Sequence, residues 1–145
     1  MSLDGVYDPN NIFAKILRGE APCHRVFEDD VALAFLDVFP QAEGHTLVVP
    51  KVAARNLFDM PAAMIGPWME RVQTVAGAVR TALQPDGIII TQFNGAPAGQ
   101  TVFHLHMHVI PRREGEALKR HAGVMADPDA LRALAARIAA AMPAA

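Results

Sequence analysis

Cysteine is nearly absent from the sequence, and this absence limits the class of protein. Cys23 is the only cysteine in 145 residues, so no disulfide can form within the chain and no Cys-x-x-Cys metal site is present. The segment Met1–Gly5 has neither a basic nor an apolar stretch of the kind found in secretory signals. No apolar run approaches the length of a membrane span. These features predict a cytoplasmic protein that does not enter a membrane.

The sequence also lacks an excess of positive charge. Thirteen lysines and arginines stand against 15 aspartates and glutamates, which gives a formal net charge of −2. A surface that neutralises many nucleic-acid phosphates normally carries a clustered basic excess, so we expect no nucleic-acid partner. A small anionic ligand is still compatible with this charge, because backbone N–H groups, hydroxyls and imidazoles can supply donors locally.

The spacing of apolar residues predicts three helices. A short helix over residues 11–18 is capped by Asn11. A long helix covers residues 61–83, and we place Pro67 near its first turn because a proline in a helix interior costs about 3 kcal/mol. An alanine-rich helix over about 128–142 carries one apolar stripe, which indicates that it docks on the rest of the chain.

Short runs rich in valine, isoleucine, leucine and phenylalanine predict about five β-strands. They cover residues 24–28, 31–37, 46–50, 88–93 and 102–111. The first three are typical of an antiparallel meander, and residues 88–93, which begin with the apolar run Ile88–Ile90, are typical of a central strand. No repeat or linker interrupts the chain. We therefore predict a single α+β domain over residues 1–145, with an antiparallel meander sheet, one long helix and shorter N- and C-terminal helices.

The segment Phe103–Ile110 alternates histidine with apolar residues. Side chains in a strand point to opposite faces in turn, so this segment would place three histidines on one face and three apolar residues on the other. These are His104, His106 and His108, and Leu105, Met107 and Val109. One face would cover the core and the other would line a cleft. Imidazole, with a pKa of about 6.5, can donate or accept hydrogen bonds or attack an electrophile at neutral pH.

Two other interpretations of the histidine row are less favoured. Chance scatter is improbable, because three of the chain's six histidines alternate strictly. Zinc is a stronger alternative, since His-x-His is a known ligand spacing and three imidazoles with a water could hold a catalytic ion. No carboxylate or second His-x-His lies nearby in the sequence, however. The loop Asn94–Thr101, with two glycines and several polar side chains directly before the row, instead favours a phosphate ligand.

The segment Asn94–Arg112, NGAPAGQTVFHLHMHVIPR, resembles the signature of the histidine triad (HIT) family, His-φ-His-φ-His-φ-φ with φ apolar. The segments 11–20, 33–37 and 44–51 resemble the HINT-like branch of this family in their order and spacing. The resemblance covers roughly residues 11–113 and implies a HIT-like fold.

The resemblance implies a catalytic role for four histidines. His106 would attack the α-phosphorus of a nucleoside 5′-phosphoryl substrate and hold the nucleotidyl group until water releases it. His104 and His108 would hold phosphate oxygens and assist the leaving group. His45 would support the triad as a fourth histidine, although a solvated turn histidine after Gly44 is an alternative.

The resemblance also implies a nucleotide-binding site. An apolar pocket would hold the base, a carboxylate would accept hydrogen bonds from the ribose hydroxyls, and the glycine loop would contact phosphate. The residues of the base pocket would be Ile12, Phe13, Phe35 and Val38. The carboxylate at the ribose would be that of Asp37. The phosphate contacts would come from Asn94, Gly99, Gln100, Thr101 and Val102. The alternatives are an ordinary core for the apolar residues and a turn residue at a strand end for Asp37.

One family pattern is missing. Many HINT-like members hold a structural zinc with two cysteines, a histidine after the Pro-Lys pair and the first triad histidine. The three positions other than His104 are here Asn11, Ala14 and Ala53. We therefore predict no structural zinc and no other cofactor, which leaves His104 for the phosphate site. His24 and His121 match no position of the family.

The function implied by the resemblance is hydrolysis of the phosphoramidase type, in which the bond between a nucleoside 5′-phosphate, purine by preference, and an amine is cleaved. The alternatives are hydrolysis of dinucleoside polyphosphates and a nucleotide-binding regulatory protein with little turnover. The resemblance also implies a homodimer that pairs through the long helix and an adjacent strand.

Overall fold

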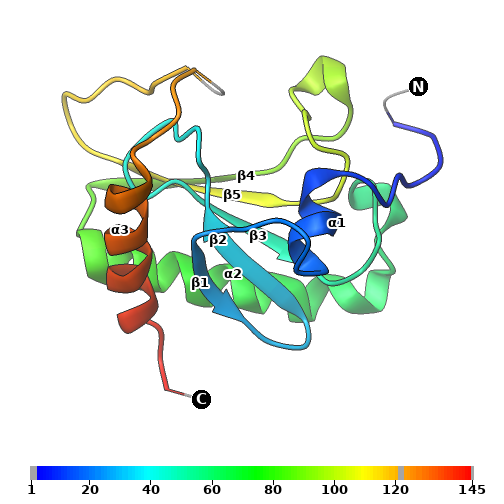
Figure 1. Ribbon diagram of the computed structural model, residues 1–145, viewed down its shortest axis with the longest axis horizontal. Coiled ribbons are helices and arrows are strands. Elements are labelled where there is room, and N and C mark those ends of the chain that lie inside the picture. Colours follow the sequence, from blue (N-terminus) through cyan, green and yellow to red (C-terminus); the bar gives the residue numbers. More distant parts are fainter. Residues whose placement is uncertain (1–2, 121–122, 145) are drawn as a thin grey trace.

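The computed structural model of the protein describes residues 3–120 and 123–144. It contains a five-stranded antiparallel sheet and three α-helices (Figure 1). The strands are β1 Arg25–Glu28, β2 Ala32–Leu36, β3 Thr46–Pro50, β4 Gly87–Thr91 and β5 Met107–Arg112. The α-helices are α1 Ile12–Leu17, α2 Ala62–Leu83 and α3 Pro128–Ala140, and two short 3₁₀ turns are η1 Leu57–Asp59 and η2 Ala96–Ala98. The predicted α+β class and antiparallel sheet are confirmed.

The strand order of the sheet is β1-β2-β3-β5-β4. The first three strands form the predicted meander, but β5 lies between β3 and β4. Because β3 and β4 both pair antiparallel with β5, they run in the same direction. Strands that run in the same direction cannot be joined by a tight turn, and α2 provides the long crossover between them.

Strand β4 lies at the edge of the sheet and not at its centre. Within residues 3–120 and 123–144, β4 pairs only with β5, and Ile90 is 45% exposed. The expectation of a central strand over residues 88–93 was therefore wrong. A continuous apolar run indicates that both faces of a strand are covered, but it does not say by what.

The histidine strand is shorter than predicted, because β5 begins at Met107. Residues 101–106 are irregular, and the N–H of Leu105 donates to the carbonyl of Ala54, 2.8 Å away. Of the three histidines, only His108 lies in the strand. The apolar side of the row still behaves as predicted, since Leu105 and Val109 are fully buried in the main core.

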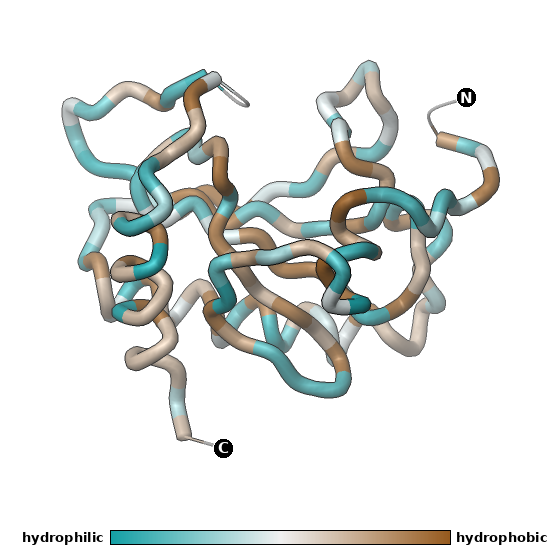
Figure 2. Tube along the Cα trace, viewed as in Figure 1, coloured by the Kyte–Doolittle hydropathy of each residue, from teal (hydrophilic) through white to brown (hydrophobic). Residues whose placement is uncertain are grey.

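Two apolar clusters lie on opposite faces of the sheet. Ala32, Ala34 and Leu36 of β2 belong to the large cluster that packs against α2 and α3, whereas Leu33 and Phe35 point the other way, toward Phe13 of α1. Figure 1 shows α2 across one face of the sheet and α1 on the other, and Figure 2 shows the most hydrophobic stretches along the central strands. Strand β2 alternates between two buried environments, so it is buried throughout.

The helices largely follow their predicted bounds. Asn11 caps α1 by accepting a hydrogen bond from the N–H of Ala14. Helix α3 docks against α2 and β1 as expected. Pro67 is the sixth residue of α2, which runs from Ala62 to Leu83, so it lies just past the first turn and close to its predicted position. Packing of the apolar face of α2 against the sheet outweighs the cost of one interior proline. Among the described residues, no helix is both long and apolar enough to cross a membrane.

The turn before β3 requires glycine at position 44, and this leads to a stability prediction. Gly44 has φ +91°, and a Cβ there would clash with Cδ1 of Leu83. We expect Gly44→Ala to lower the free energy of unfolding by about 3 kcal/mol, from backbone strain and overpacking together. Urea unfolding measures this loss. Gly19 is the matched control, since it has φ +77° but no atom within 4 Å of the position that a Cβ would take. Gly19→Ala should cost only about 1 kcal/mol, from backbone strain alone, and equal losses in the two variants would contradict the prediction.

Candidate active site

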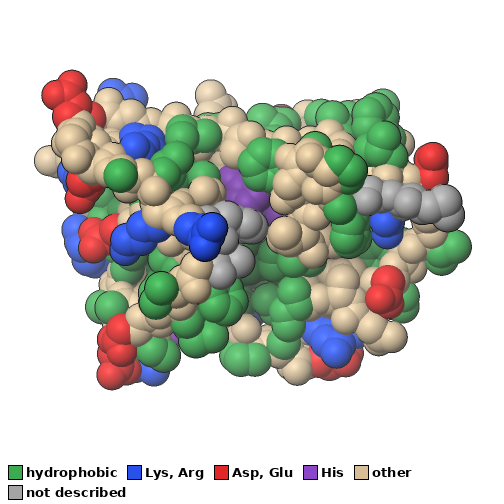
Figure 3. Space-filling model, turned by 90° about the horizontal axis from the view of Figure 1, so that it is seen from above, with side chains coloured by type: hydrophobic (Ala, Val, Ile, Leu, Met, Phe, Trp, Pro, Cys, Tyr) green, Lys and Arg blue, Asp and Glu red, His purple; other side chains and the backbone are tan. Residues whose placement is uncertain are grey.

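A cavity of about 480 Å³ opens on the face of the sheet that α1 covers. Its walls are mostly apolar, and its polar lining residues are Asp37, Thr101, His106 and His108. Ile12, Phe13, Phe35, Asp37, Val38, Thr101, Val102, His106 and His108 are predicted site residues that line it. In Figure 3, histidine side chains are visible at the bottom of a hollow in the surface. Residues far apart in the sequence thus meet around a single cavity.

The ring nitrogen of His106 that carries the proton determines which nitrogen can act as a nucleophile. Its Nδ1 lies 2.7 Å from the carbonyl oxygen of His104. A carbonyl can only accept, so Nδ1 carries the proton and the lone pair of the neutral ring is on Nε2. The ring is further held edge-on by Phe13 and His108, both with centroids 4.9 Å away. His106 therefore has the tautomer of a nucleophile.

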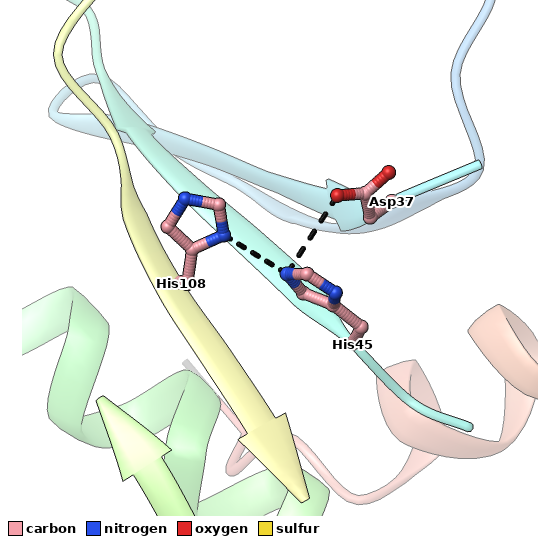
Figure 4. A group of neighbouring side chains, drawn as sticks. All are labelled: Asp37, His45 and His108. Carbon is pink, nitrogen blue, oxygen red and sulfur yellow. Dashed lines mark hydrogen bonds and ion pairs between the residues drawn. The ribbon is translucent and has the colours of Figure 1, made fainter. Parts of the chain in front are cut away.

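A second chain of hydrogen bonds sets the tautomer of His108. The backbone N–H of Gln41 donates to His45 Nδ1 at 3.0 Å, so the proton of neutral His45 is on Nε2. This Nε2 lies 2.9 Å from His108 Nδ1 and donates to it (Figure 4). The proton of neutral His108 is then on Nε2, where it can serve as a hydrogen-bond donor. His45 is buried, with 1% exposure, so the alternative of a solvated turn histidine does not apply.

Asp37 follows the last residue of β2 and is nearly buried. Its Oδ1 accepts from the N–H of Phe39 at 2.8 Å, and its Oδ2 lies 3.6 Å from His45 Nε2. Asp37 also lines the cavity, as the predicted role at the ribose requires. The interpretation as a turn residue is correct as well, because the bond to Phe39 closes a turn.

Asp37, His45 and His108 also form the kind of cluster that can hold a metal ion, with ligand atoms within 4.8 Å of one another. The hydrogen bonds argue against this use. His45 could bind a metal through Nε2 only if that nitrogen lost its proton, whereas the bond from Gln41 to Nδ1 keeps the proton there. The arrangement suits proton-bearing imidazoles better than a cation. The absence of a cofactor stays a prediction.

His104 does not lie where the prediction placed it. It is 1% exposed, it is not among the residues that line the cavity, and its two ring nitrogens contact the Tyr7 hydroxyl and the Pro50 carbonyl, at 2.6 and 2.9 Å. These contacts do not fit a phosphate ligand. Burial lowers the pKa of His104, and the bond to Pro50 opposes this only in part. His104 is thus a neutral, structural histidine.

The glycine loop is organised by its own polar side chains. The Gln100 side-chain oxygen accepts from the N–H of Gly95 at 2.8 Å, and its amide nitrogen donates to the carbonyls of Arg55 and Val102, at 2.8 and 3.1 Å. Asn94 accepts from the N–H of Leu57 at 3.0 Å. Both side chains shape the loop and do not line the cavity, contrary to the predicted phosphate contacts.

Gly99 lies in the same loop, with φ +110°, and also lies outside the cavity lining. Within the predicted phosphate loop, only Thr101 and Val102 reach the cavity.

Several residues that line the cavity were not among the site residues predicted from the sequence. Ile16 and Leu47 fall on helix and strand positions whose spacing predicted burial, but spacing does not tell core from cavity wall. Cys23 also lines the cavity, and burial raises the pKa of its thiol. Tyr7 carried no motif. His24 lies away from the cavity, on the surface near Arg132, and His121 lies outside the described residues.

The fold and site together define an α+β protein with a buried triad of imidazoles beside a ligand-sized cavity. The HIT domain model matches residues 18–115. The chain therefore belongs to the histidine triad family.

Individual relatives agree with this assignment. A crystal structure of a Hit-like protein involved in cell-cycle regulation from Bartonella henselae, with an unknown ligand, is similar at 48% identity and a TM-score of 0.90, over 95% of this chain and 100% of that one. A Zn-bound histidine triad family protein from Mycobacterium smegmatis is similar at 38% identity and a TM-score of 0.79, over 91% and 92%. The adenylylsulfatase HINT3 of Arabidopsis thaliana is 38% identical over 116 residues, which are 76% of this chain but only 59% of that protein.

The buried neutral His104 gives a prediction about pH. Its pKa lies below the ordinary value of 6.5, so unfolded chains take up this proton more readily than folded ones. The contribution of neutral His104 to the free energy of unfolding is complete above about pH 6.5, the pKa of an unfolded histidine. It is lost as the pH falls toward the lower pKa of His104 in the folded protein. Urea unfolding at several pH values should show this decline. His104→Gln can still donate to Pro50 but cannot titrate, so its decline should be shallower. An equally steep decline in that variant would assign the effect to other groups.

Proposed function

We propose that the protein hydrolyses nucleoside 5′-phosphoryl compounds at the α-phosphate through a covalent intermediate on His106. The observation that carries this proposal is the arrangement of protons. His106 presents a lone pair on Nε2, and its neighbour His108 carries a proton on Nε2. One imidazole is thus set to attack phosphorus and the other to stabilise a phosphoryl oxygen.

The cavity has the size and polarity that a nucleotide needs. Its volume of about 480 Å³ lies within the range of small-molecule sites, about 300–1,000 Å³. Phe13 and Phe35 offer apolar surface to a base, and a purine is the base we propose. Asp37 would accept hydrogen bonds from the ribose hydroxyls. The bound nucleotide would then lie with its base near α1 and its phosphate near the histidines. Thr101 and Val102 would lie beside the phosphate.

The proposed chemistry takes place in two displacements. His106 Nε2 forms a bond to the α-phosphorus while the bond to the leaving group breaks, and the N–H of His108 stabilises the charge on a phosphoryl oxygen. Water then attacks phosphorus, the P–N bond to His106 breaks, and the nucleoside monophosphate departs. Overall, the hydroxyl of one water ends on phosphorus. An amine leaving group takes a proton from solvent as its bond to phosphorus breaks, and the attacking water releases its second proton to solvent in the second displacement, so the protons balance.

Leaving groups other than an amine fit the same scheme. The similarity to the adenylylsulfatase of Arabidopsis favours sulfate, which leaves as a stable anion without needing a proton. A dinucleoside polyphosphate is a further alternative. A regulatory protein that binds nucleotide with little turnover would need the cavity but would not need the tautomer of His106.

Replacing the nucleophile tests the mechanism. We expect His106→Ala to lower kcat by a factor on the order of 10³ or more for adenosine phosphoramidate, adenylyl sulfate and diadenosine polyphosphate alike, because all three would need the same attack. The variant should still bind AMP, since the base and ribose contacts remain. The steady-state rates of the wild-type protein on the three substrates also identify the preferred leaving group.

His24→Ala is the matched control, because His24 lies away from the cavity. It should retain wild-type kcat. Turnover by His106→Ala at the wild-type rate would refute the covalent mechanism. Binding of AMP without turnover of any substrate by the wild-type protein would favour the regulatory alternative.

We further propose that the protein forms a homodimer through α2 and the edge strand β4. An open groove beside them is lined by Gly66, Met69, Glu70, Val72, Gln73, Ala76 and Ile90. Ile90 and Met69 are 45% and 37% exposed. An edge strand with exposed apolar side chains is a surface that proteins normally cover. The cytoplasmic location and the single domain over residues 1–145 stay predictions.

A charge introduced into this groove at Ile90 should disrupt the dimer. We expect the wild-type protein to have the mass of a dimer in light scattering and Ile90→Lys to shift it toward the monomer, because a lysine would be buried against the partner. Val124→Lys is the control, since Val124 is 83% exposed and lies elsewhere. A wild-type monomer at micromolar concentration would contradict the proposal.

A further inference from the structure

Tyr7 lies behind the row of histidines, in the segment before α1. Its hydroxyl is 2.6 Å from His104 Nδ1, and the two rings meet edge to face with centroids 5.7 Å apart. On the opposite side of the ring, His104 Nε2 lies 2.9 Å from the carbonyl oxygen of Pro50. That carbonyl can only accept, so Nε2 carries the proton and Nδ1 carries the lone pair. The Tyr7 hydroxyl therefore donates to His104.

We infer that Tyr7 is a positioning residue for His106 and acts through His104. The backbone carbonyl of His104 is the group that accepts the proton of His106 Nδ1, at 2.7 Å. The peptide group that carries this carbonyl is held on its other side by the N–H of Leu105, which donates to the Ala54 carbonyl at 2.8 Å. The His104 ring, fixed at both nitrogens by Tyr7 and by Pro50, holds the same irregular segment 101–106 through its side chain. The orientation of this carbonyl then decides which nitrogen of His106 faces the cavity.

The Tyr7 contact also holds one wall of the cavity. A tight turn joins Tyr7 to α1, in which Asp8 accepts from the N–H of Asn10 at 2.8 Å and from the side chain of Asn11 at 2.7 Å. Asn11 in turn caps α1. Phe13 of this helix packs edge-on against His106. The N-terminal segment thus holds His106 from two sides, through His104 and through Phe13.

The same contacts show that the zinc site of the HINT-like pattern does not fit this chain. Three of its four positions are Asn11, Ala14 and Ala53, none of which is a zinc ligand of the usual kind. The fourth, His104, has its lone pair engaged by Tyr7 and its proton engaged by Pro50. In this chain a tyrosine hydroxyl joins the N-terminal segment to the first triad histidine, as a zinc ion would in the pattern that the chain lacks.

The kinetic test is Tyr7→Phe, which removes the hydroxyl and keeps the ring. We expect kcat on the substrate that the wild-type protein cleaves fastest to fall roughly tenfold, since a small misplacement of the nucleophile is costly. The KM and the Kd for AMP should change by less than about threefold, because the base and ribose contacts remain. Val6→Ala, in the same segment with Val6 91% exposed, should behave as wild type. An unchanged kcat in Tyr7→Phe, or a loss confined to KM, would overturn the inference.

A measurement that does not use turnover separates this inference from the proposed function. The ¹⁵N resonances of the imidazoles report tautomer and hydrogen bonding, and we expect those of His104 and His106 to move in Tyr7→Phe while that of His24 does not. If the wild-type protein cleaves no substrate, the proposed function fails and these resonances alone decide the role of Tyr7. If the His106 resonances do not move in Tyr7→Phe, the inference that Tyr7 positions His106 is overturned.

The chain holds a single tyrosine, which provides a test that leaves Tyr7 in place. Uniform 3-fluorotyrosine labelling marks Tyr7 alone, and its ¹⁹F resonance should move in His104→Gln but not in Val6→Ala. This keeps the inference falsifiable even if Tyr7→Phe does not fold. Stoichiometric zinc in the purified protein, lost together with the native ¹⁹F resonance on chelation, would also refute it.

Discussion

The hydrogen bond from His106 Nδ1 to the backbone carbonyl of His104 is the interaction on which the site depends. A neutral imidazole has one donor and one acceptor, so fixing the proton on one nitrogen fixes the lone pair on the other. The same logic applies along the row, because the N–H of Gln41 sets the tautomer of His45 and His45 sets that of His108. Backbone groups, whose donor or acceptor character cannot change, thus determine the chemistry of three ionisable side chains.

This arrangement requires that every buried imidazole have hydrogen-bond partners. His45, His104 and His108 are each 2% exposed or less, and a buried polar group without a partner is costly. The two-faced sheet meets this requirement. One face packs on α2 and α3 and forms the main core, while the other carries His108 and the cavity and is covered by α1 only in part. The cavity is therefore bounded by a rigid sheet, which suits precise positioning.

The sequence was informative where a local pattern corresponds to a single structure. Alternation of histidine with apolar residues put Leu105 and Val109 in the core, and helical spacing located α1, α2 and α3 to within a few residues. It was less informative where two structures share one pattern. The apolar run around β4 suits a central strand as well as an edge strand that a partner could cover, and Gln100 looks the same whether it binds a phosphate or its own loop.

The sequence by itself determined the family and the triad motif, because these depend on residue types at fixed spacings along one stretch of chain. Only the tertiary structure decided which histidines face the cavity and which nitrogen each presents. Those properties depend on distant contacts, since Tyr7 and Pro50 lie 97 and 54 positions from His104, and His45 lies 63 positions from its partner in β5. No spacing rule encodes such contacts, because they arise only when the folded sheet brings distant groups beside the imidazoles.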